Sequence, residues 1–436
     1  MSKKAIKWLY QQLPGLVAQG ILSEQAAAKL QQHYGEVKDT GKKMVALIMC
    51  GALGALLIGL GIILLLGHNW EQLSRPIRAV LSILPLVIGQ AFALWVLRNR
   101  SESSGLKEAT AIFLSLMVGA SIALISQTYN IPGNTDTFIL TWMLLIAPLI
   151  YLMQASLPAA IYLIGITCWS GSYWNNPKMA ILFWPLAAVV IPHFIWALRR
   201  NIYTIRASIL SLIMVGCVLF GASFSLGKAW PNFWTIIFPS IFAIFYYVGH
   251  KEFKQFTSNW QGPLRLVSTL GIVVIAFQFT FRYIWEHTYR VYPSYGRELS
   301  GLSALPDHFI SFLIVALALV IFYDNLKNKN LTGSLFTGFP LLALIGYFAR
   351  EQTLVFPLLI FNAYLLYLSL SRIIIGIRNN SLAAINMGML ILGILIIARF
   401  FDSDINFLFK GLVFIVLGIG FLVTNVVLIR RKGGAQ

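Results

Sequence analysis

Long apolar runs separated by short polar segments make up most of this 436-residue chain. A helix that crosses a bilayer needs about 20 mostly apolar residues, since each residue advances about 1.5 Å through a hydrocarbon core of about 30 Å. By this criterion the pattern predicts an all-α polytopic membrane bundle of about 14 transmembrane helices. The predicted spans cover residues 44–66, 77–97, 109–127, 138–153, 157–173, 179–198, 205–226, 232–249, 264–284, 307–323, 334–348, 353–371, 380–399 and 408–429. The sequence leaves open whether the short runs at 138–153, 157–173 and 334–348 all cross.

Residues 1–43 differ from the rest because their apolar positions alternate with polar ones at helical spacing. An apolar residue recurs every three or four positions in the first half of this segment, which places these residues on one helical face. Ser23 suits the N-cap of a second helix, and Gly35 suits its C-terminal end. The pattern therefore predicts two domains, a cytoplasmic amphipathic helical hairpin at 1–43 and a multi-span transmembrane domain at 44–436. So short a hairpin is expected to pack on the membrane domain, on another copy or on a cytoplasmic protein partner.

Composition and charge support this division. Hydrophobic residues make up 58% of the chain and charged residues 11%, and the mean hydropathy is +0.77. If the N-terminus is cytoplasmic, most of the 33 Lys and Arg residues fall in segments predicted inside, as the positive-inside rule requires. The net charge of +18 is then a consequence of topology and indicates no nucleic-acid partner. Both termini are predicted to be cytoplasmic, and anionic membrane lipids are expected partners.

Three stretches resemble a known family. They are GILSEQAAAKL at 20–30, GLGIILLLGHNW at 59–70, and ISQTYNIPGNTDTFILTWMLLIAPLIYL at 125–152. Together they are similar to the domain-of-unknown-function 2157 family of bacterial polytopic membrane proteins. The resemblance covers about the first third of the chain and implies a place in the bacterial cytoplasmic (inner) membrane. It implies no activity, because the family has none assigned.

Candidate binding residues gather at the predicted outer ends of spans and, as amides, within spans. No Asp or Glu lies in the middle of a predicted span, which weakens the case for a carboxylate proton relay, although a helix boundary shifted by one turn could bring one in. Arginines that converge at the outer end could bind phosphate or carboxylate, whereas the alternative is that they only extend to the interface. The candidate binding residues are Arg75, Arg78, Gln127, Tyr129, Asp136, Arg282, Glu286, Arg350, Glu351, Arg399, Asp402, Gln278 and Asn362.

The sequence offers little for catalysis or for a cofactor. The three cysteines, Cys50, Cys168 and Cys217, lie in apolar runs without the spacing of a metal site. His308 beside Asp307 reads as an interface residue rather than as half of an acid–base pair. We therefore expect no enzyme activity, no cofactor and no metal.

Two functions from different classes remain open. One is a transporter or flippase for a small anionic or lipid-linked solute, which many spans, several intramembrane prolines and short loops favour. The other is a non-transporting scaffold or sensor whose N-terminal hairpin at 1–43 binds a cytoplasmic partner. A polar cavity among the helices would favour transport.

Overall fold

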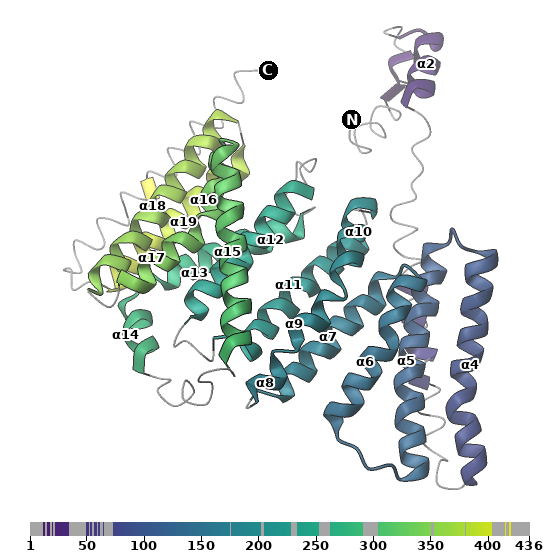
Figure 1. Cartoon of the computed structure of the whole chain (residues 1–436). Helices are drawn as coiled ribbons and strands as arrows, with labels where there is room; N and C mark the ends of the chain where they lie inside the picture. Colours follow the sequence, from purple (N-terminus) through teal and green to yellow (C-terminus); the bar gives the residue numbers. More distant parts are fainter. Residues whose placement is uncertain are drawn as a thin grey trace. The chain divides into compact units, whose positions relative to one another are not determined.

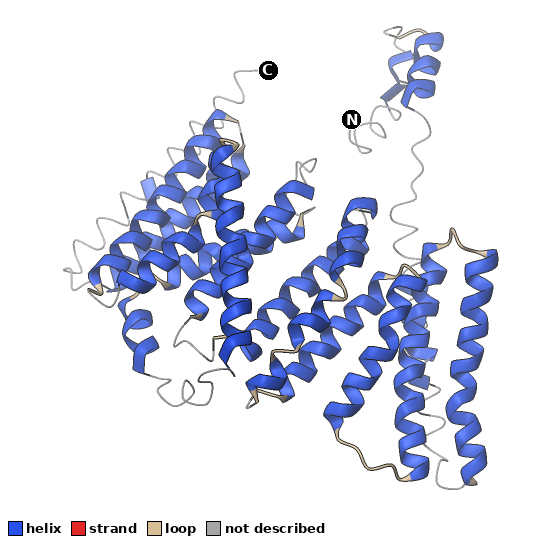
Figure 2. Ribbon diagram, in the orientation of Figure 1, coloured by secondary structure: helices blue, strands red, loops and turns tan. Residues whose placement is uncertain are grey.

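The computed structural model describes residues 12–13, 15–17, 20, 22–34, 49–51, 53–54, 56–58, 60–61, 64, 73–174, 176–201, 205–227, 233–252, 262–290, 304–349, 353–379, 381–402, 415 and 418–419. In these residues every regular element is a helix (Figure 1, Figure 2). The chain divides into two compact units, Met1–Asn130 and Ile131–Gln436. The all-α prediction is therefore confirmed for the described part of the chain.

The first unit contains α2 (Glu24–Tyr34), α4 (Arg75–Asn99) and α5 (Ser104–Tyr129). Ser23 precedes α2, and its hydroxyl accepts a hydrogen bond from the Ala26 amide at 3.2 Å, as expected of an N-cap. The other helix of the predicted hairpin and the boundary expected near residue 43 lie mostly or wholly outside the described residues, so both remain predictions.

Helices α4 and α5 pack against each other over much of their length. The Ser121 hydroxyl of α5 donates to the Ser82 carbonyl of α4 at 2.6 Å. A Cβ atom at Gly89 would lie only 2.8 Å from the Leu114 side chain, so this glycine permits the close approach. Away from this contact, apolar side chains such as Val80 (61% exposed) face outward.

The second unit contains the remaining described helices. They are α6 (Thr135–Leu152), α7 (Ser156–Ser172), α8 (Pro177–Ala180), α9 (Phe183–Ala188), α10 (Ile191–Asn201), α11 (Ile205–Ser225), α12 (Trp234–Glu252), α13 (Pro263–Gln278), α14 (Arg282–Arg290), α15 (Leu305–Lys327), α16 (Leu331–Thr337), α17 (Phe339–Ala349), α18 (Val355–Arg378) and α19 (Leu382–Asp402). The principal packing pairs are α6 with α7, α7 with α11, α12 with α13, and α18 with α19.

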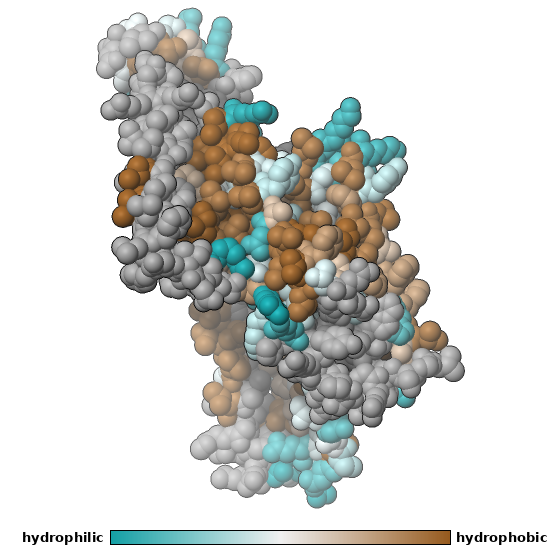
Figure 3. Space-filling view, turned by 90° about the vertical axis from the view of Figure 1, so that its left-hand side faces the viewer, coloured by the Kyte–Doolittle hydropathy of each residue, from teal (hydrophilic) through white to brown (hydrophobic). Residues whose placement is uncertain are grey.

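Nine helical segments of the described chain are long and apolar enough to cross a membrane. Apolar side chains cover wide areas of the face seen in Figure 3. Such a surface requires lipid as its solvent, so this is a membrane protein with multiple spans. Among the other predicted spans, 157–173 corresponds to the 17-residue α7, and 232–249 and 264–284 to shorter apolar helices. The spans at 44–66 and 408–429 fall largely outside the described residues, so the count of about 14 stays a prediction.

The predicted span 179–198 corresponds to the candidate spanning segment Lys178–Arg199, which turns divide into α8, α9 and α10. Pro185 and Pro192 lie in the first turns of α9 and α10, where a missing backbone donor costs least. Side chains of the neighbouring helices bond the carbonyls near the breaks. The Tyr162 hydroxyl donates to the Leu186 carbonyl at 3.1 Å, and Tyr151 donates to the Val189 carbonyl. Hydrogen bonds from α6 and α7 therefore stabilise the junction between α9 and α10.

The predicted spans 264–284 and 334–348 are also interrupted. The first ends as α13 at Gln278, and the chain turns through Phe279 into α14, where the Trp285 indole donates to the Phe279 carbonyl at 2.8 Å. The second corresponds to the candidate spanning segment Leu331–Ala349, which a turn at Gly338 divides into α16 and α17. A buried apolar cluster joins the segment around Ile181 to α11, α12, α15 and α17. The interrupted segments α8–α10 and α16–α17 thus contribute to the same buried cluster.

Candidate functional site

A buried carboxyl group lies at the start of α15. Asp307 is the third residue of this helix and is only 5% exposed. Its Oδ1 atom accepts a hydrogen bond from the Ser311 hydroxyl, one turn further along α15, at 3.1 Å. The same atom accepts from the Gly227 amide, also at 3.1 Å. The carboxyl group is therefore held in place from two separate helices, α15 and the end of α11.

Gly227 can donate to Asp307 because of its backbone conformation. Helix α11 ends at Ser225, and Gly227 follows with φ of +75°, in the left-handed region that glycine adopts at little cost. This turn ends the helix and points the amide across to α15. A side chain here would meet no serious steric obstacle, since the nearest atom to an added Cβ is 3.8 Å away, but the backbone would be strained.

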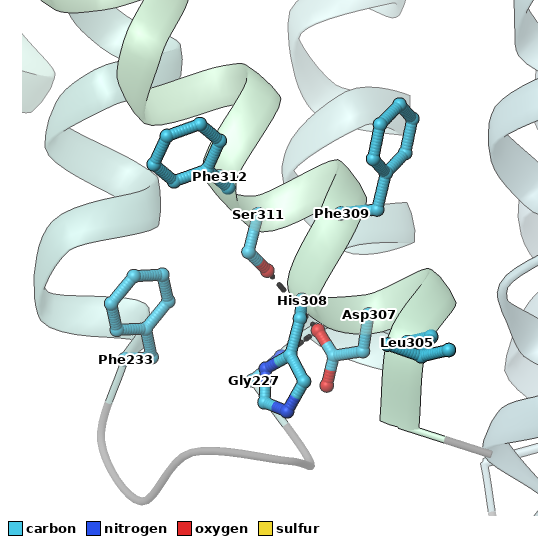
Figure 4. A pocket seen from close by; sticks show the side chains of 8 residues that line it. All are labelled: Gly227, Phe233, Leu305, Asp307, His308, Phe309, Ser311 and Phe312. Atoms are coloured by element: carbon cyan, nitrogen blue, oxygen red, sulfur yellow. Dashed lines mark hydrogen bonds between the residues drawn. The ribbon is translucent and has the colours of Figure 1, made fainter. Parts of the chain in front are cut away.

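Asp307 lines a pocket of about 370 Å³ together with His308 and Ser311 (Figure 4). In the close-up the carboxyl group lies between the Ser311 hydroxyl and the Gly227 amide, with the His308 ring beside it. The other lining residues are Gly227, Phe233, Leu305, Phe309 and Phe312. A volume of this size is at the lower end of the range usual for small-ligand pockets, roughly 300 to 1,000 Å³.

The pocket has a buried inner wall and an exposed rim. Asp307, Ser311 and Phe233 are buried, whereas Phe309 is 68% and Phe312 73% exposed. In a membrane the exposed phenylalanines of α15 face lipid or another membrane-embedded surface. The pocket therefore presents carboxyl oxygens and an imidazole at its inner wall and aromatic rings at its edge. Such a wall suits an amphipathic molecule with a hydrogen-bond donor or a positive charge.

Three predicted site residues lie at or near the turn between α13 and α14. The Arg399 guanidinium, near the end of α19, donates from Nη2 to the Thr280 hydroxyl at 3.1 Å and lies 4.9 Å from the centre of the Phe281 ring. Arg282 is next in the chain, and its Nε lies 2.5 Å from Glu286 Oε1. Arg282 is therefore engaged by a carboxylate of its own helix, and the binding role expected of these residues stays a prediction.

Other predicted site residues are distributed more widely. Arg75, Arg78, Gln127 and Tyr129 belong to the first unit, and Asp136 to the second. Arg78 donates from Nε to the Leu73 carbonyl at 2.8 Å, while Arg75, Gln127 and Tyr129 are exposed.

Two amides and three charged residues complete the predicted set. In the second unit Gln278 is exposed, and Asn362 donates to the Leu358 carbonyl of its own helix at 2.8 Å. Asp402 is the last residue of α19. Arg350 and Glu351 lie outside the described residues. Whether these residues bind anything remains a prediction.

The sequence did not single out Asp307 as a site residue. Its predicted span began at residue 307, so this acid was assigned to the interface, whereas α15 begins at Leu305. Glu108 is similar, since α5 begins at Ser104 and this acid is only 1% exposed. The sequence did contain a signal, because Ser311 follows the Asp307–His308 pair by one helical turn. The other partner of the Asp307 carboxyl group is Gly227, which lies 80 positions earlier.

Comparison with protein families confirms the resemblance proposed from the sequence. Residues 14–159 match the family described as "Predicted membrane protein (DUF2157)". The match includes α2, α4, α5 and α6 and ends within α7. Comparison with curated proteins and with solved structures yields no match. The family assigns the matched segment to membrane proteins and gives no activity.

Proposed function

We propose that this membrane protein is a transporter for a small amphipathic solute that carries a hydrogen-bond donor or a positive charge. The observation that carries the proposal is the buried carboxyl group of Asp307 on the wall of the α15 pocket. Carboxyl groups are rare within membrane bundles because desolvation is costly, and those that occur there usually serve binding or transport. The rim at Phe309 and Phe312 would receive the apolar part of the solute.

The packing beneath the pocket supports movement as well as binding. Phe233 lines the pocket and also belongs to the buried apolar cluster that includes Ile181, beside α8 and α9. The same cluster reaches Tyr347 in α17, the second half of another interrupted segment. Short helices that meet at breaks can tilt about those breaks, and such broken helices are common around transporter binding sites. A solute that pushes on Phe233 would therefore act on both interrupted segments.

The proposed charge preference differs from the anionic solute expected from the arginines. Arg282 contacts Glu286 within α14, Arg399 contacts Thr280 on the α13–α14 turn, and neither arginine lines the pocket. The pocket instead offers the acceptor oxygens of Asp307. We therefore give more weight to the chemistry of the pocket wall than to the arginine cluster.

Thermal unfolding in nanodiscs, followed by uptake into proteoliposomes, tests the proposal. A panel of amphipathic amines and quaternary ammonium compounds is compared with carboxylic acids of the same carbon skeleton. We expect some amines to raise the Tm of the wild type and to accumulate in proteoliposomes, and we expect Asp307→Asn to lose both effects. The matched control is Asp324→Asn, at the other end of α15, where the acid accepts from the Tyr247 hydroxyl at 3.0 Å.

Two outcomes would contradict the proposal. If Asp307→Asn binds and transports the amines as the wild type does, the pocket is not the solute site. If no compound is taken up while a cytoplasmic protein is retained by residues 1–43, the scaffold or sensor function is favoured instead.

A further inference from the structure

A second cluster of polar and basic side chains lies at the opposite end of α15 from the pocket. It includes His250 near the end of α12, Arg265 near the start of α13, and Arg372 in the last third of α18. Asn325 and Asn330 complete it between α15 and α16. The 18 positions from Asp307 to Asn325 correspond to about 27 Å of helix. The cluster is thus separate from the proposed solute site.

Specific contacts bring these residues together. The Phe336 ring of α16 lies 4.7 Å from the Tyr246 ring, centre to centre, and the Arg372 Cζ atom lies 5.7 Å from the centre of Phe336. Tyr246 in turn stacks on His250, one helical turn further along α12, at 6.1 Å. The His250 Nε2 atom is 3.5 Å from the Asn330 amide nitrogen. The Tyr246 ring thus joins the His250 imidazole to Phe336, and the Arg372 guanidinium lies over the same Phe336 ring.

Arg265 reaches the same place from α13. A Cβ atom at Gly249 would lie 2.8 Å from the Arg265 backbone nitrogen, so α12 and α13 are in close contact next to His250. His250, next to Gly249, stacks on Tyr246, and the Phe336 ring that Arg372 covers contacts the same Tyr246, so Arg265 and Arg372 approach this tyrosine from α13 and α18. Two like charges from separate helices are therefore held near one point.

No acid compensates these charges in the part of the chain that the structure describes. Neither Arg265 nor Arg372 forms an ion pair there, and the Nε atom of Arg372 is buried without a hydrogen-bond partner. Asp324 lies at this end too, but its contacts are the Tyr247 hydroxyl and the Asn328 amide. Both arginines are half-buried as whole residues. Like charges held together without an acid favour an anionic ligand.

We propose that Arg265 and Arg372 bind a phosphate group at this end of the second unit. The geometry favours a phospholipid headgroup as its source. Leu366 and Leu370 precede Arg372 on α18, toward the membrane centre, and are 45% and 44% exposed, so acyl chains can cover this helix while the phosphate contacts the arginines. Basic pockets between transmembrane helices bind lipid headgroups in this way. The positive-inside prediction assigns this end to the cytoplasmic leaflet.

Native mass spectrometry of the full chain, extracted from nanodiscs of phosphatidylcholine with or without phosphatidylglycerol, tests the proposal. The double variant Arg265→Gln/Arg372→Gln removes both charges and keeps similar side-chain length. The control, Lys327→Gln/Arg378→Gln, removes two exposed charges from α15 and α18 at the same end. We expect the wild type and the control to retain phosphatidylglycerol, and the double variant to bind it roughly tenfold or more weakly.

Calorimetry with inorganic phosphate distinguishes the two sources. If lipid retention is the same in all three proteins but only the wild type and the control bind inorganic phosphate, the site takes a soluble phosphate. The proposal is overturned if the wild type binds neither probe, or if the control loses binding as fully as the double variant. Should the double variant fail to fold in phosphatidylcholine alone, Arg372→Lys replaces it. This variant keeps the charge but loses the planar fork, so it should bind more weakly than the wild type, and unchanged binding would count against the site.

Discussion

At the residue scale, glycines decide how closely the helices of the second unit approach one another. An added Cβ would lie 2.1 Å from Met143 at Gly165, 2.3 Å from Phe183 at Gly221 and 2.4 Å from Phe242 at Gly271. Apolar side chains gain little from leaving lipid, so close packing between helices is a main source of their association in a membrane. At Gly249 an added Cβ would lie 2.8 Å from the backbone nitrogen of Arg265, which cannot move aside as a flexible side chain can.

Gly249→Ala should therefore destabilise the protein by roughly 1 to 3 kcal/mol, because α12 and α13 must separate. The measurement is the free energy of unfolding in mixed micelles of increasing denaturing detergent. Gly216→Ala in α11 is the control, since no atom lies within 4 Å of an added Cβ there. Helix propensity alone should leave the control unchanged or more stable by about 0.5 to 1 kcal/mol. Equal stability of the two variants would contradict the α12–α13 contact.

The contacts of the site residues can be predicted from the sequence only where the partners are close along the chain. Arg282 and Glu286 are four positions apart in one helix, and their ion pair follows from spacing alone. The contact between Arg399 and Thr280 joins positions 119 apart, and only its predicted location at one membrane end could be anticipated. Asp307 was missed because hydropathy places a helix end only to within a turn, and one turn decides whether an acid is buried.

At the element scale, the interrupted segment α8–α10 depends on hydroxyl groups supplied by its neighbours. Tyr162 is completely buried in α7, and its hydroxyl donates to the Leu186 carbonyl at 3.1 Å. Ser170 of the same helix donates to the Ala180 carbonyl at 3.0 Å. Carbonyls near helix breaks need such partners, because lipid offers none.

Tyr162→Phe should lower the free energy of unfolding by about 1 kcal/mol, since the Leu186 carbonyl loses this donor. The ring and its packing are retained, so the change isolates the hydroxyl. Tyr323→Phe, on an exposed surface of α15, serves as the control and should have no effect. Chemical unfolding followed by circular dichroism measures both. A Tyr162→Phe protein as stable as the control would show that the break does not depend on this bond.

The sequence predicts the positions of these elements better than their continuity. The spans expected at 77–97, 109–127, 307–323 and 380–399 correspond to α4, α5, α15 and α19, because a run of apolar residues in lipid has few alternatives to a helix. Proline alone does not reveal a break. Pro85, Pro148 and Pro239 lie inside α4, α6 and α12, whereas α9 and α10 begin near their prolines. The difference depends on which neighbours can bond the freed carbonyls.

At the scale of the whole molecule, the orientation of α15 determines which compartment each site faces. The positive-inside rule predicts that Lys327 and Lys329 are cytoplasmic and that the start of the helix is outside. Alkaline phosphatase fused after Ala304 should therefore be active, and green fluorescent protein fused after Asn328 should fluoresce. The inverse pattern would mean that one of the predicted spans 138–153 and 157–173 does not cross. The proposed solute pocket would then open to the cytoplasm.

The hydrogen bond between Gly227 and Asp307 has a consequence for how this protein can change over evolutionary time. The amide that steadies the carboxyl group comes from a backbone with φ of +75°, which residues with side chains adopt only under strain. A substitution at either position therefore weakens the selection that maintains the other residue. Descendants that abandon the acid are free to replace the glycine, and those that keep one are constrained to keep both. The two residues are therefore expected to change together in evolution, although 80 positions separate them.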